Sequence, residues 1–238
     1  MVNPTPRILF ITGTDTGVGK TVLTALLLGH LRQQGLHALA MKPFCSGDRA
    51  DASLLHSIQD GELTLEEVNP FFFEEPVAPL VALRQHNLSI PLQEVLQRVS
   101  HAATRCERLL IEGSGGLLVP LGEGYSVCDL IAKLDCEVIV VSRNRLGTIN
   151  HTLLTVGALQ EAGLTRLTVV MMDQASSDHS TASNKLILGE LLGQVPLHSL
   201  GFLDGNASRT EALKRAEKIF EKTLALILAN LHAGQRSL

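Results

Sequence analysis

Lys20 and Thr21 follow a glycine-bearing turn in a setting that could bind phosphate. The hydrophobic run 8–12 precedes the turn, and an apolar helical pattern follows it. Glycines let backbone N–H groups crowd around phosphate oxygens, and the positive end of the following helix dipole adds to the attraction. Lys20 can then reach the outer phosphates while the Thr21 hydroxyl reaches Mg²⁺. The predicted nucleotide-binding residues of this loop are Gly17, Val18, Gly19, Lys20, Thr21 and Val22.

The loop departs in one place from the strict pattern Gly-x-x-x-x-Gly-Lys-[Ser/Thr]. That pattern needs a glycine where this sequence has Thr14, and Gly13 stands one residue earlier. Asp15 occupies the position of the signature lysine of some dimeric P-loop ATPases, so no such lysine role is expected. A chance Gly-x-Gly-Lys-Thr match on a surface turn is the alternative, and the flanking strand and helix patterns count against it.

Two carboxylates are candidates for holding a metal ion near the phosphates. Glu112 ends the buried run 109–112, and the glycine-rich segment 113–116 behind it allows close approach of a phosphate or substrate. Glu112 is therefore the best candidate for a metal ligand. Asp51 either contributes a second carboxylate or caps the helix that follows the second strand, and local sequence favours the cap.

Lys42 directly follows the strand-like run 38–41, at the end of a strand where α/β active sites gather. A second lysine there would stabilise phosphoryl charge beside Lys20, and a solvated surface lysine is the open alternative. Ser114 and Cys45 are not expected to be nucleophiles. Neither has the Gly-x-Ser-x-Gly frame, and no histidine is positioned to act as a base.

The segment 146–151, Leu-Gly-Thr-Ile-Asn-His, follows another strand-like run. A helix that begins near Thr148 would offer free N–H groups to an anion such as a carboxylate. Local physics favours the alternative, an ordinary strand-to-helix turn with His151 packed or solvated.

Short β-branched and aliphatic runs alternate with longer helical patterns, as in proteins with buried parallel strands. The expected strands are residues 8–12, 38–41, 109–112, 138–142, 167–172 and 195–200. The expected helices are residues 21–34, 50–57, 92–106, 149–162, 183–192 and 208–231. The alternation predicts an α/β fold with a doubly wound, mostly parallel sheet and helices on both faces, in a single domain over residues 1–238.

The segment 60–91 contains acidic residues, prolines and the run Phe71, Phe72, Phe73. One interpretation is a long excursion between elements, of the kind that often serves function in compact domains. The other is a helical or irregular cover that packs the three phenylalanines on the core. The sequence does not decide between them.

The composition excludes several classes of function. A net charge of −4, no Trp and a single Tyr leave no basic surface and few stacking side chains, so neither nucleic acid nor a membrane is an expected partner. No apolar run approaches bilayer length, and the N-terminus lacks the pattern of a signal peptide. The four cysteines are widely spaced and read as reduced thiols. We therefore expect a cytoplasmic enzyme that acts on small molecules.

Five ordered motifs resemble the dethiobiotin synthetase family, and the resemblance covers residues 8–165. They are Gly-Thr-Asp-Thr-Gly-Val-Gly-Lys-Thr at 13–21, Lys-Pro-Phe-Cys-Ser-Gly at 42–47, Val-Asn-Pro at 68–70, Glu-Gly-Ser-Gly-Gly at 112–116 and Leu-Gly-Thr-Ile-Asn-His at 146–151. Unrelated P-loop proteins share only the first. The resemblance implies the P-loop NTPase fold and a homodimer with its substrate site at the subunit interface.

The same resemblance implies a reaction. One amine of 7,8-diaminononanoate (7,8-diaminopelargonate) captures CO₂ as a carbamate, and ATP, with Mg²⁺, phosphorylates that carbamate. The other amine then closes the cyclic urea of dethiobiotin, and ADP and phosphate are released. Such chemistry requires positioning and neutralisation of phosphoryl charge rather than a covalent enzyme intermediate.

Roles follow from the resemblance for each residue that matches a motif. The implied catalytic residues are Lys20 and Lys42. The implied nucleotide contacts are the loop residues named above together with Asp51, Glu112, Gly113, Ser114 and Gly115. The implied Mg²⁺ ligands are Thr21, Asp51 and Glu112. The implied substrate-binding residues are Thr16, Lys42, Ser46, Gly147, Thr148 and Asn150, with Asn150 reaching the substrate carboxylate from the partner subunit.

Three positions depart from the family pattern. Met172 stands where some members carry an Asn that contacts adenine, Gly201 is not followed by the expected proline, and Gly17 replaces a larger residue of some relatives. Phosphate transfer is expected to survive these changes. The preferred nucleoside triphosphate stays open, as does the form of the substrate, free diamine or carbamate.

Two other functions compete with this interpretation. An amidoligase of cobyrinate or cobyric acid synthesis would bring a glutamine amidotransferase domain, for which the chain has no room. A partitioning or maturation ATPase would use hydrolysis as a switch for a protein or membrane partner. Asp15 and the absence of an amphipathic membrane-targeting tail count against that switch.

Overall fold

Six strands form the central sheet of the computed structural model, which describes residues 7–202 and 209–233. They are β1 (Arg7–Gly13), β2 (Ala38–Met41), β5 (Arg108–Glu112), β8 (Cys136–Arg143), β9 (Leu167–Met172) and β10 (Leu197–Leu200). Their order is β10-β9-β8-β1-β5-β2, and every neighbouring pair is parallel. The predicted α/β sheet is thus confirmed, and each predicted strand belongs to it.

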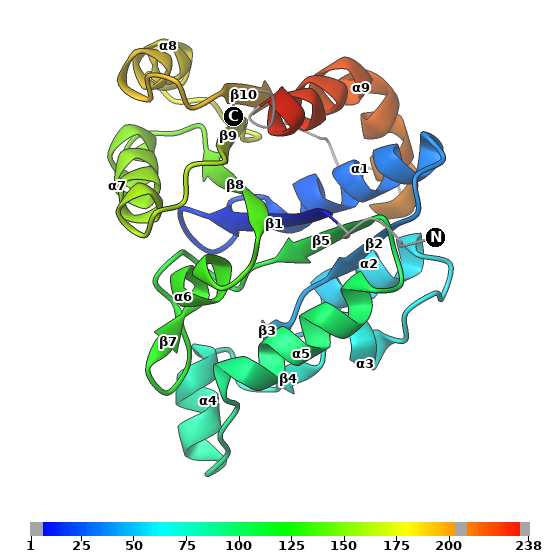
Figure 1. Ribbon diagram of the computed structural model, residues 1–238. Coiled ribbons are helices and arrows are strands. Elements are labelled where there is room, and N and C mark those ends of the chain that lie inside the picture. The colour runs from blue at the N-terminus through cyan, green and yellow to red at the C-terminus, as the bar shows by residue number, and fades with distance from the viewer. Residues whose placement is uncertain (1–6, 203–208, 234–238) are drawn as a thin grey trace.

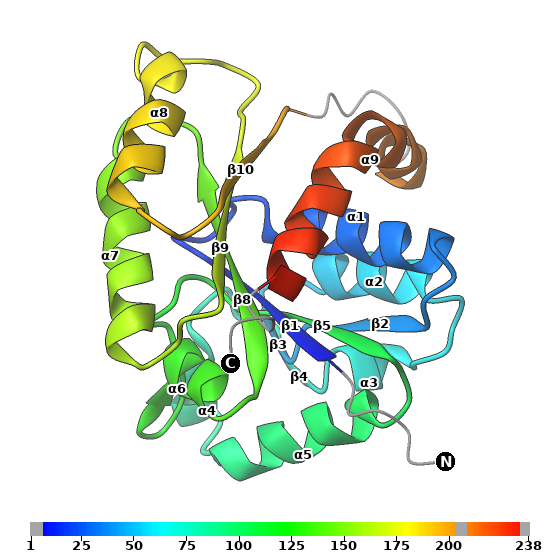
Figure 2. The same cartoon turned by 45° about the horizontal axis from the view of Figure 1, so that its top comes forward.

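Helices cover both faces of this sheet, because each strand is apolar on its two sides. Helices α1 (Lys20–Gln33) and α9 (Arg209–Ala233) lie side by side on one face, and α5 (Leu92–Ala103) and α6 (Val127–Ala132) lie on the other (Figures 1 and 2). Helix α7 (Thr148–Glu161) packs on β8, and α8 (Thr181–Leu191) packs on α7 and β10. The predicted start of the last helix, residue 208, lies outside the described residues.

The segment 60–91 is not one irregular excursion. It contains α3 (Leu65–Val68), β4 (Phe71–Phe73) and α4 (Pro79–Gln85). Strand β4 pairs in parallel with β3 (Phe44–Ser46), outside the central sheet. Phe71 and Phe73 are each 7% exposed and belong to the core, so the covering interpretation is right for two of the three phenylalanines. Phe72 is half-buried, and the Arg49 guanidinium lies 5.2 Å above its ring.

Short elements also follow β2 and β5. Helix α2 (Ala50–Ile58) follows β3, as predicted, and the hairpin of β6 (Pro120–Gly122) and β7 (Tyr125–Ser126) leads into α6. Ser126 and Asp129 form a capping box at the start of α6. None of β3, β4, β6, β7, α3, α4 and α6 was predicted, because each has only two to seven residues, too few for a clear periodic pattern.

The parallel register brings the strand ends of the motifs to one edge of the sheet. Gly13 of β1 is opposite Val141 of β8, and Ile11 is opposite Glu112 of β5. The loops after β1, β2, β5 and β8 therefore start at the same edge, where ligands bind in open α/β sheets. In the described ranges, no helix has the length and apolar character required to cross a bilayer.

Candidate active site

Two lysines and two carboxylates converge at the carboxyl edge of the sheet. Lys42 Nζ lies 2.8 Å from Asp51 Oδ2 and 2.5 Å from Glu112 Oε1. Thr21 Oγ1 donates to the same Glu112 oxygen at 2.7 Å. Lys20, Thr21, Lys42 and Glu112 are all buried. The residues predicted from separate motifs therefore form one cluster.

The glycine-bearing loop adopts a conformation that its glycines permit. Gly17 has φ of +66° and Gly19 of +105°, in the left-handed region where a Cβ is strained. Lys20 Nζ crosses the loop to donate to the Asp15 carbonyl at 2.9 Å and to the Gly115 carbonyl at 2.6 Å. The loop and the glycine-rich segment after β5 are thus linked through one ammonium group.

The surroundings of the two lysines shift their pKa values in opposite directions. Burial lowers the pKa of Lys20 to about 8, although Glu112 opposes the shift and Lys42 adds to it. Burial acts in the same direction on Lys42, but Glu112 and Asp51 outweigh it and raise the pKa of Lys42 above its ordinary value. Lys42 is therefore a charged, buried ammonium, and the surface-lysine alternative is wrong.

Asp51 does not cap the helix that contains it, which corrects the interpretation favoured by local sequence. Helix α2 has Arg49 at its N-cap position, with no side-chain cap. Asp48 Oδ1 instead accepts from the Ala50 N–H at 2.8 Å. Asp51, in the first turn, contacts Lys42, so its carboxylate belongs to the cluster.

The residues present fit a magnesium ion. Glu112 Oε2 is buried and, within the described part of the chain, has no hydrogen-bond partner. Mg²⁺ is bound in nucleotide enzymes by one or two carboxylates, phosphate oxygens and waters. Glu112, Asp51 and Thr21 provide such oxygens. Across residues 7–202 and 209–233, no three His, Cys, Asp or Glu side chains form a metal-binding group.

The remaining residues of the loops after β2 and β5 surround this cluster. Ser114 Oγ donates to the Phe44 carbonyl at 2.7 Å, which joins the glycine-rich segment to β3. Ser46 Oγ is buried without a partner among the described residues. Burial raises the pKa of the Cys45 thiol to about 12. Neither Cys45 nor Ser114 has the surroundings of a nucleophile, as predicted.

The segment 146–151 forms the start of α7. Gly147 is the N-cap residue, with φ of +93°, and α7 begins at Thr148. Thr148 is buried, whereas Asn150 and His151 are exposed. Asn150 therefore faces outward and is not part of the cluster around Lys42 within this chain.

Two residues at the end of β8 were not identified from the sequence as candidates for the site or its surroundings. Arg143, at the end of β8, donates from Nε to the Gly17 carbonyl at 3.0 Å and from Nη2 to the Thr16 carbonyl at 2.9 Å. Asn144 donates to Asp173 Oδ1 at 2.8 Å and accepts from Asn184 at 3.0 Å, which ties β8 to the ends of β9 and α8. The only available signal was their place at the end of the strand next to β1.

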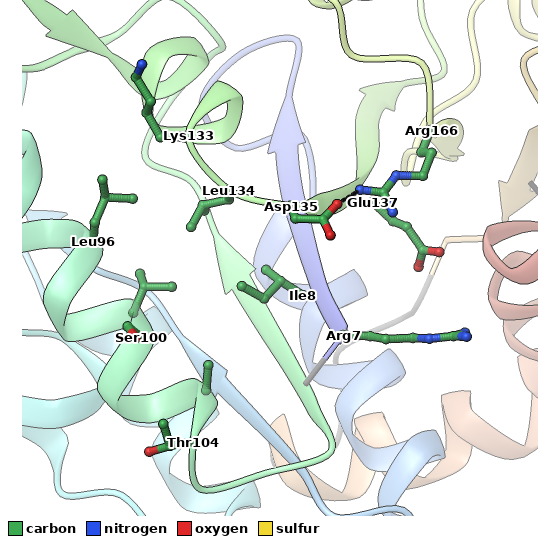
Figure 3. Close-up of a pocket in the computed structure, with 12 residues that line it drawn as sticks. Arg7, Ile8, Leu96, Ser100, Thr104, Lys133, Leu134, Asp135, Glu137 and Arg166 are labelled. Atoms are coloured by element: carbon green, nitrogen blue, oxygen red, sulfur yellow. Dashed lines mark hydrogen bonds and ion pairs between the residues drawn. The ribbon is translucent and has the colours of Figure 1, made fainter. Parts of the chain in front are cut away.

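A cavity of about 540 Å³ lies at the opposite, amino edge of the sheet. Ile8 and Leu134 lie in it opposite Leu96 of α5, and Asp135 forms an ion pair with Arg166 (Figure 3). No predicted site residue lines this cavity, so we do not assign the chemistry to it.

Comparisons with known proteins agree with this geometry. The family model of an AAA domain matches residues 7–200. The chain is 42% identical to the ATP-dependent dethiobiotin synthetase BioD of Anaeromyxobacter sp. (strain Fw109-5), over 87% of this chain and 96% of that protein. It is 38% identical to the protein of the same name from Bacillus subtilis (strain 168), over 80% of this chain and 85% of the relative.

Solved structures support the fold independently. The ParA family ATPase from Chlorobium tepidum TLS superposes with a TM-score of 0.55 at 15% identity, over 90% of this chain and 92% of that one. The MinC:MinD cell division protein complex of Aquifex aeolicus gives a TM-score of 0.56 at 14% identity, over 90% and 87%. At such identities the likeness establishes the P-loop fold alone. The sequence matches go further, and with them the chain belongs to the ATP-dependent dethiobiotin synthetase family.

Proposed function

We propose that this enzyme is a single domain over residues 1–238 that converts 7,8-diaminononanoate and CO₂ to dethiobiotin, with ATP and Mg²⁺. The observation that supports it best is the Lys42 ammonium between Glu112 and Asp51. It lies beside a phosphate loop whose own lysine, Lys20, is also buried. A carbamate and a transferring phosphoryl group are both anionic, and paired lysines suit both. Four free thiols agree with a cytoplasmic protein.

The roles proposed for the chain's own groups follow from charge and position. Lys20 neutralises the outer phosphates, and Lys42 stabilises the carbamate oxygens and the phosphoryl group that they accept. Glu112, Asp51 and Thr21 hold Mg²⁺, which neutralises phosphate charge when bound. Gly113, Ser114 and Gly115 carry backbone groups close to the nucleotide. Burial of the cluster excludes water, which protects the phosphorylated carbamate from hydrolysis.

The substrate side of the proposed site needs a second subunit. Thr16 and Ser46 face the diamine near Lys42, whereas Asn150 and the N–H groups at Gly147 and Thr148 bind its carboxylate tail from the partner. Large exposed apolar side chains follow β5 and β8 close to these segments: Leu118 is 70% exposed, Leu146 80% and Leu154 65%. Burial of these side chains against a second subunit would help to stabilise the homodimer.

A doubly tagged heterodimer tests this shared site. One subunit carries Lys42→Ala and the other Asn150→Asp, which repels the substrate carboxylate. If each site takes Asn150 from the partner, one of the two sites is wholly wild type, and the heterodimer has about half the wild-type turnover. Each homodimeric variant serves as the control. A heterodimer as inactive as both parents would show that Asn150 acts within its own subunit.

The lowered pKa of Lys20 predicts how nucleotide affinity depends on pH. Because its pKa is lowered to about 8, the free enzyme loses the Lys20 charge as the pH rises through that value. Bound phosphates favour the ammonium, so MgATP binding should weaken above pH 8 and take up a proton there. Calorimetry in two buffers of different ionisation enthalpy measures that proton. Lys20→Arg stays charged, so a proton uptake that persists in this variant would contradict the assignment to Lys20.

Release of phosphate distinguishes this function from a nucleotide-driven switch. A dethiobiotin synthetase should release phosphate faster when both diaminononanoate and bicarbonate are present, because the carbamate is the phosphoryl acceptor. A partitioning or maturation ATPase should ignore both compounds. Equal release with and without them would favour the switch.

A further inference from the structure

We infer that Arg143 is a positioning residue that holds the phosphate loop in its nucleotide-binding shape. The inference rests on the proposed role of that loop, and it concerns a residue outside the predicted site. Arg143 is half-buried at the end of β8, and its guanidinium donates to two successive carbonyls of the loop, those of Thr16 and Gly17. A planar guanidinium can span two such acceptors with a fixed geometry, which an ammonium cannot do.

The hydrogen bonds set the direction of two peptide units. No peptide bond among the described residues is cis, so each N–H points opposite to the carbonyl of its own peptide unit. Because the Thr16 and Gly17 carbonyls face Arg143, the N–H groups of Gly17 and Val18 face away from it. Those are two of the N–H groups predicted to bind phosphate oxygens.

Arg143 can keep this position against the loop because residue 17 is glycine. A Cβ placed on Gly17 would lie 2.5 Å from Arg143 Nη2, closer than two such atoms can approach. Met172, at the end of β9, lies in the same way against Gly19, where a Cβ would be 3.1 Å from the Met172 Cγ. Side chains from two neighbouring strands thus cover the outer side of the loop, and Arg143 alone of the two can donate hydrogen bonds to it.

Arg143→Ala should therefore weaken MgATP binding about tenfold, since two charge-assisted hydrogen bonds are lost. Turnover at saturating MgATP should stay within about twofold, because the residue acts on binding and not on the reacting groups. Arg143→Lys should fall between. The matched control is Arg145→Ala, which removes the same charge from an exposed position two residues away and should leave MgATP affinity unchanged.

Calorimetric titration of the purified enzyme with MgATP gives the affinities, and thermal melting confirms that each variant is folded. Wild-type affinity in Arg143→Ala, or lower turnover with unchanged affinity, would overturn the inference. Because binding is measured without diamine or bicarbonate, failure of the proposed reaction would be seen separately, as absence of dethiobiotin from an enzyme that binds MgATP normally.

A double-mutant cycle tests whether Gly17 and Arg143 act together. In Gly17→Ala the new Cβ displaces the guanidinium, so adding Arg143→Ala should weaken MgATP binding no further. Independent effects that multiply in the double variant would contradict a shared role.

Discussion

Lys42→Ala should lower kcat by about two to three orders of magnitude, the usual effect of losing one preorganised group that stabilises developing charge. Lys42 is 7% exposed and charged, and it lies within hydrogen-bond distance of Asp51 and Glu112, the two carboxylates among the three proposed metal ligands. No other described ammonium bonds both Glu112 and Asp51. MgATP affinity should change much less, because Lys20 and the loop remain. Steady-state turnover and calorimetric binding of MgATP measure the two effects separately.

A stability effect must be separated from this loss of turnover. Breaking a buried ion pair by removing one partner costs about 3–5 kcal/mol, because the other charge stays buried. Thermal melting with and without Mg²⁺ shows how much of this cost the metal offsets. Lys42→Arg keeps a charge between the carboxylates, so it should melt near the wild type yet lose at least about tenfold in kcat, since its planar group does not fit where Nζ lies. Wild-type turnover in either variant would remove Lys42 from the mechanism.

Glu112→Gln should remove the dependence of nucleotide binding on Mg²⁺ and lower kcat by about a thousandfold. Glu112 is 1% exposed, and one of its oxygens accepts from both Thr21 and Lys42. Its other oxygen is buried without a partner in the described chain. An amide keeps the size of the side chain but replaces a carboxylate oxygen by a donor, which cannot bind a cation.

Titration of MgATP and of ATP in the presence of a chelator measures this effect directly. In the wild type Mg²⁺ should tighten binding, and in Glu112→Gln the two titrations should coincide. Glu107→Gln, at the exposed amino end of the same region, is the matched control and should behave as the wild type. If Glu112→Gln keeps the full Mg²⁺ dependence, the metal is held elsewhere.

The central sheet could be predicted from the sequence because its strands are short, continuous hydrophobic runs. Runs such as Val138–Ser142 are buried on both faces, so composition alone marks them. The β3 to β4 pair has no such signal, since each strand has only three residues and pairs across the intervening α2 and α3. Phe71 is a core residue through a tertiary contact, because its ring lies 4.9 Å from that of Phe44, and Phe73 is buried opposite Ser46 in the same strand pair.

The site was partly predictable on the same grounds. Lys20 and Lys42 lie after recognisable strands and Glu112 ends one, and parallel strands end at a common edge, so the proximity of the three residues followed from the fold class. The prediction that Asp51 caps α2 was wrong because the capping position depends on where the helix begins. Helix α2 begins at Ala50, whose N–H donates to the Asp48 side chain, so Asp51 lies inside the first turn. Arg143 could not be assigned, because its partners lie 126 and 127 residues away and it contacts their backbone.

The most direct test of the account is mass spectrometry of the products formed by the purified protein. The protein is incubated with 7,8-diaminononanoate, bicarbonate and Mg²⁺, with ATP, CTP and GTP supplied in turn. Dethiobiotin is expected with ATP. The yields with CTP and GTP show how selective the enzyme is for the base, with Met172 beside Gly19 in place of the Asn of some family members. Absence of dethiobiotin with every nucleotide, from protein shown to be folded and dimeric, would contradict the proposed reaction.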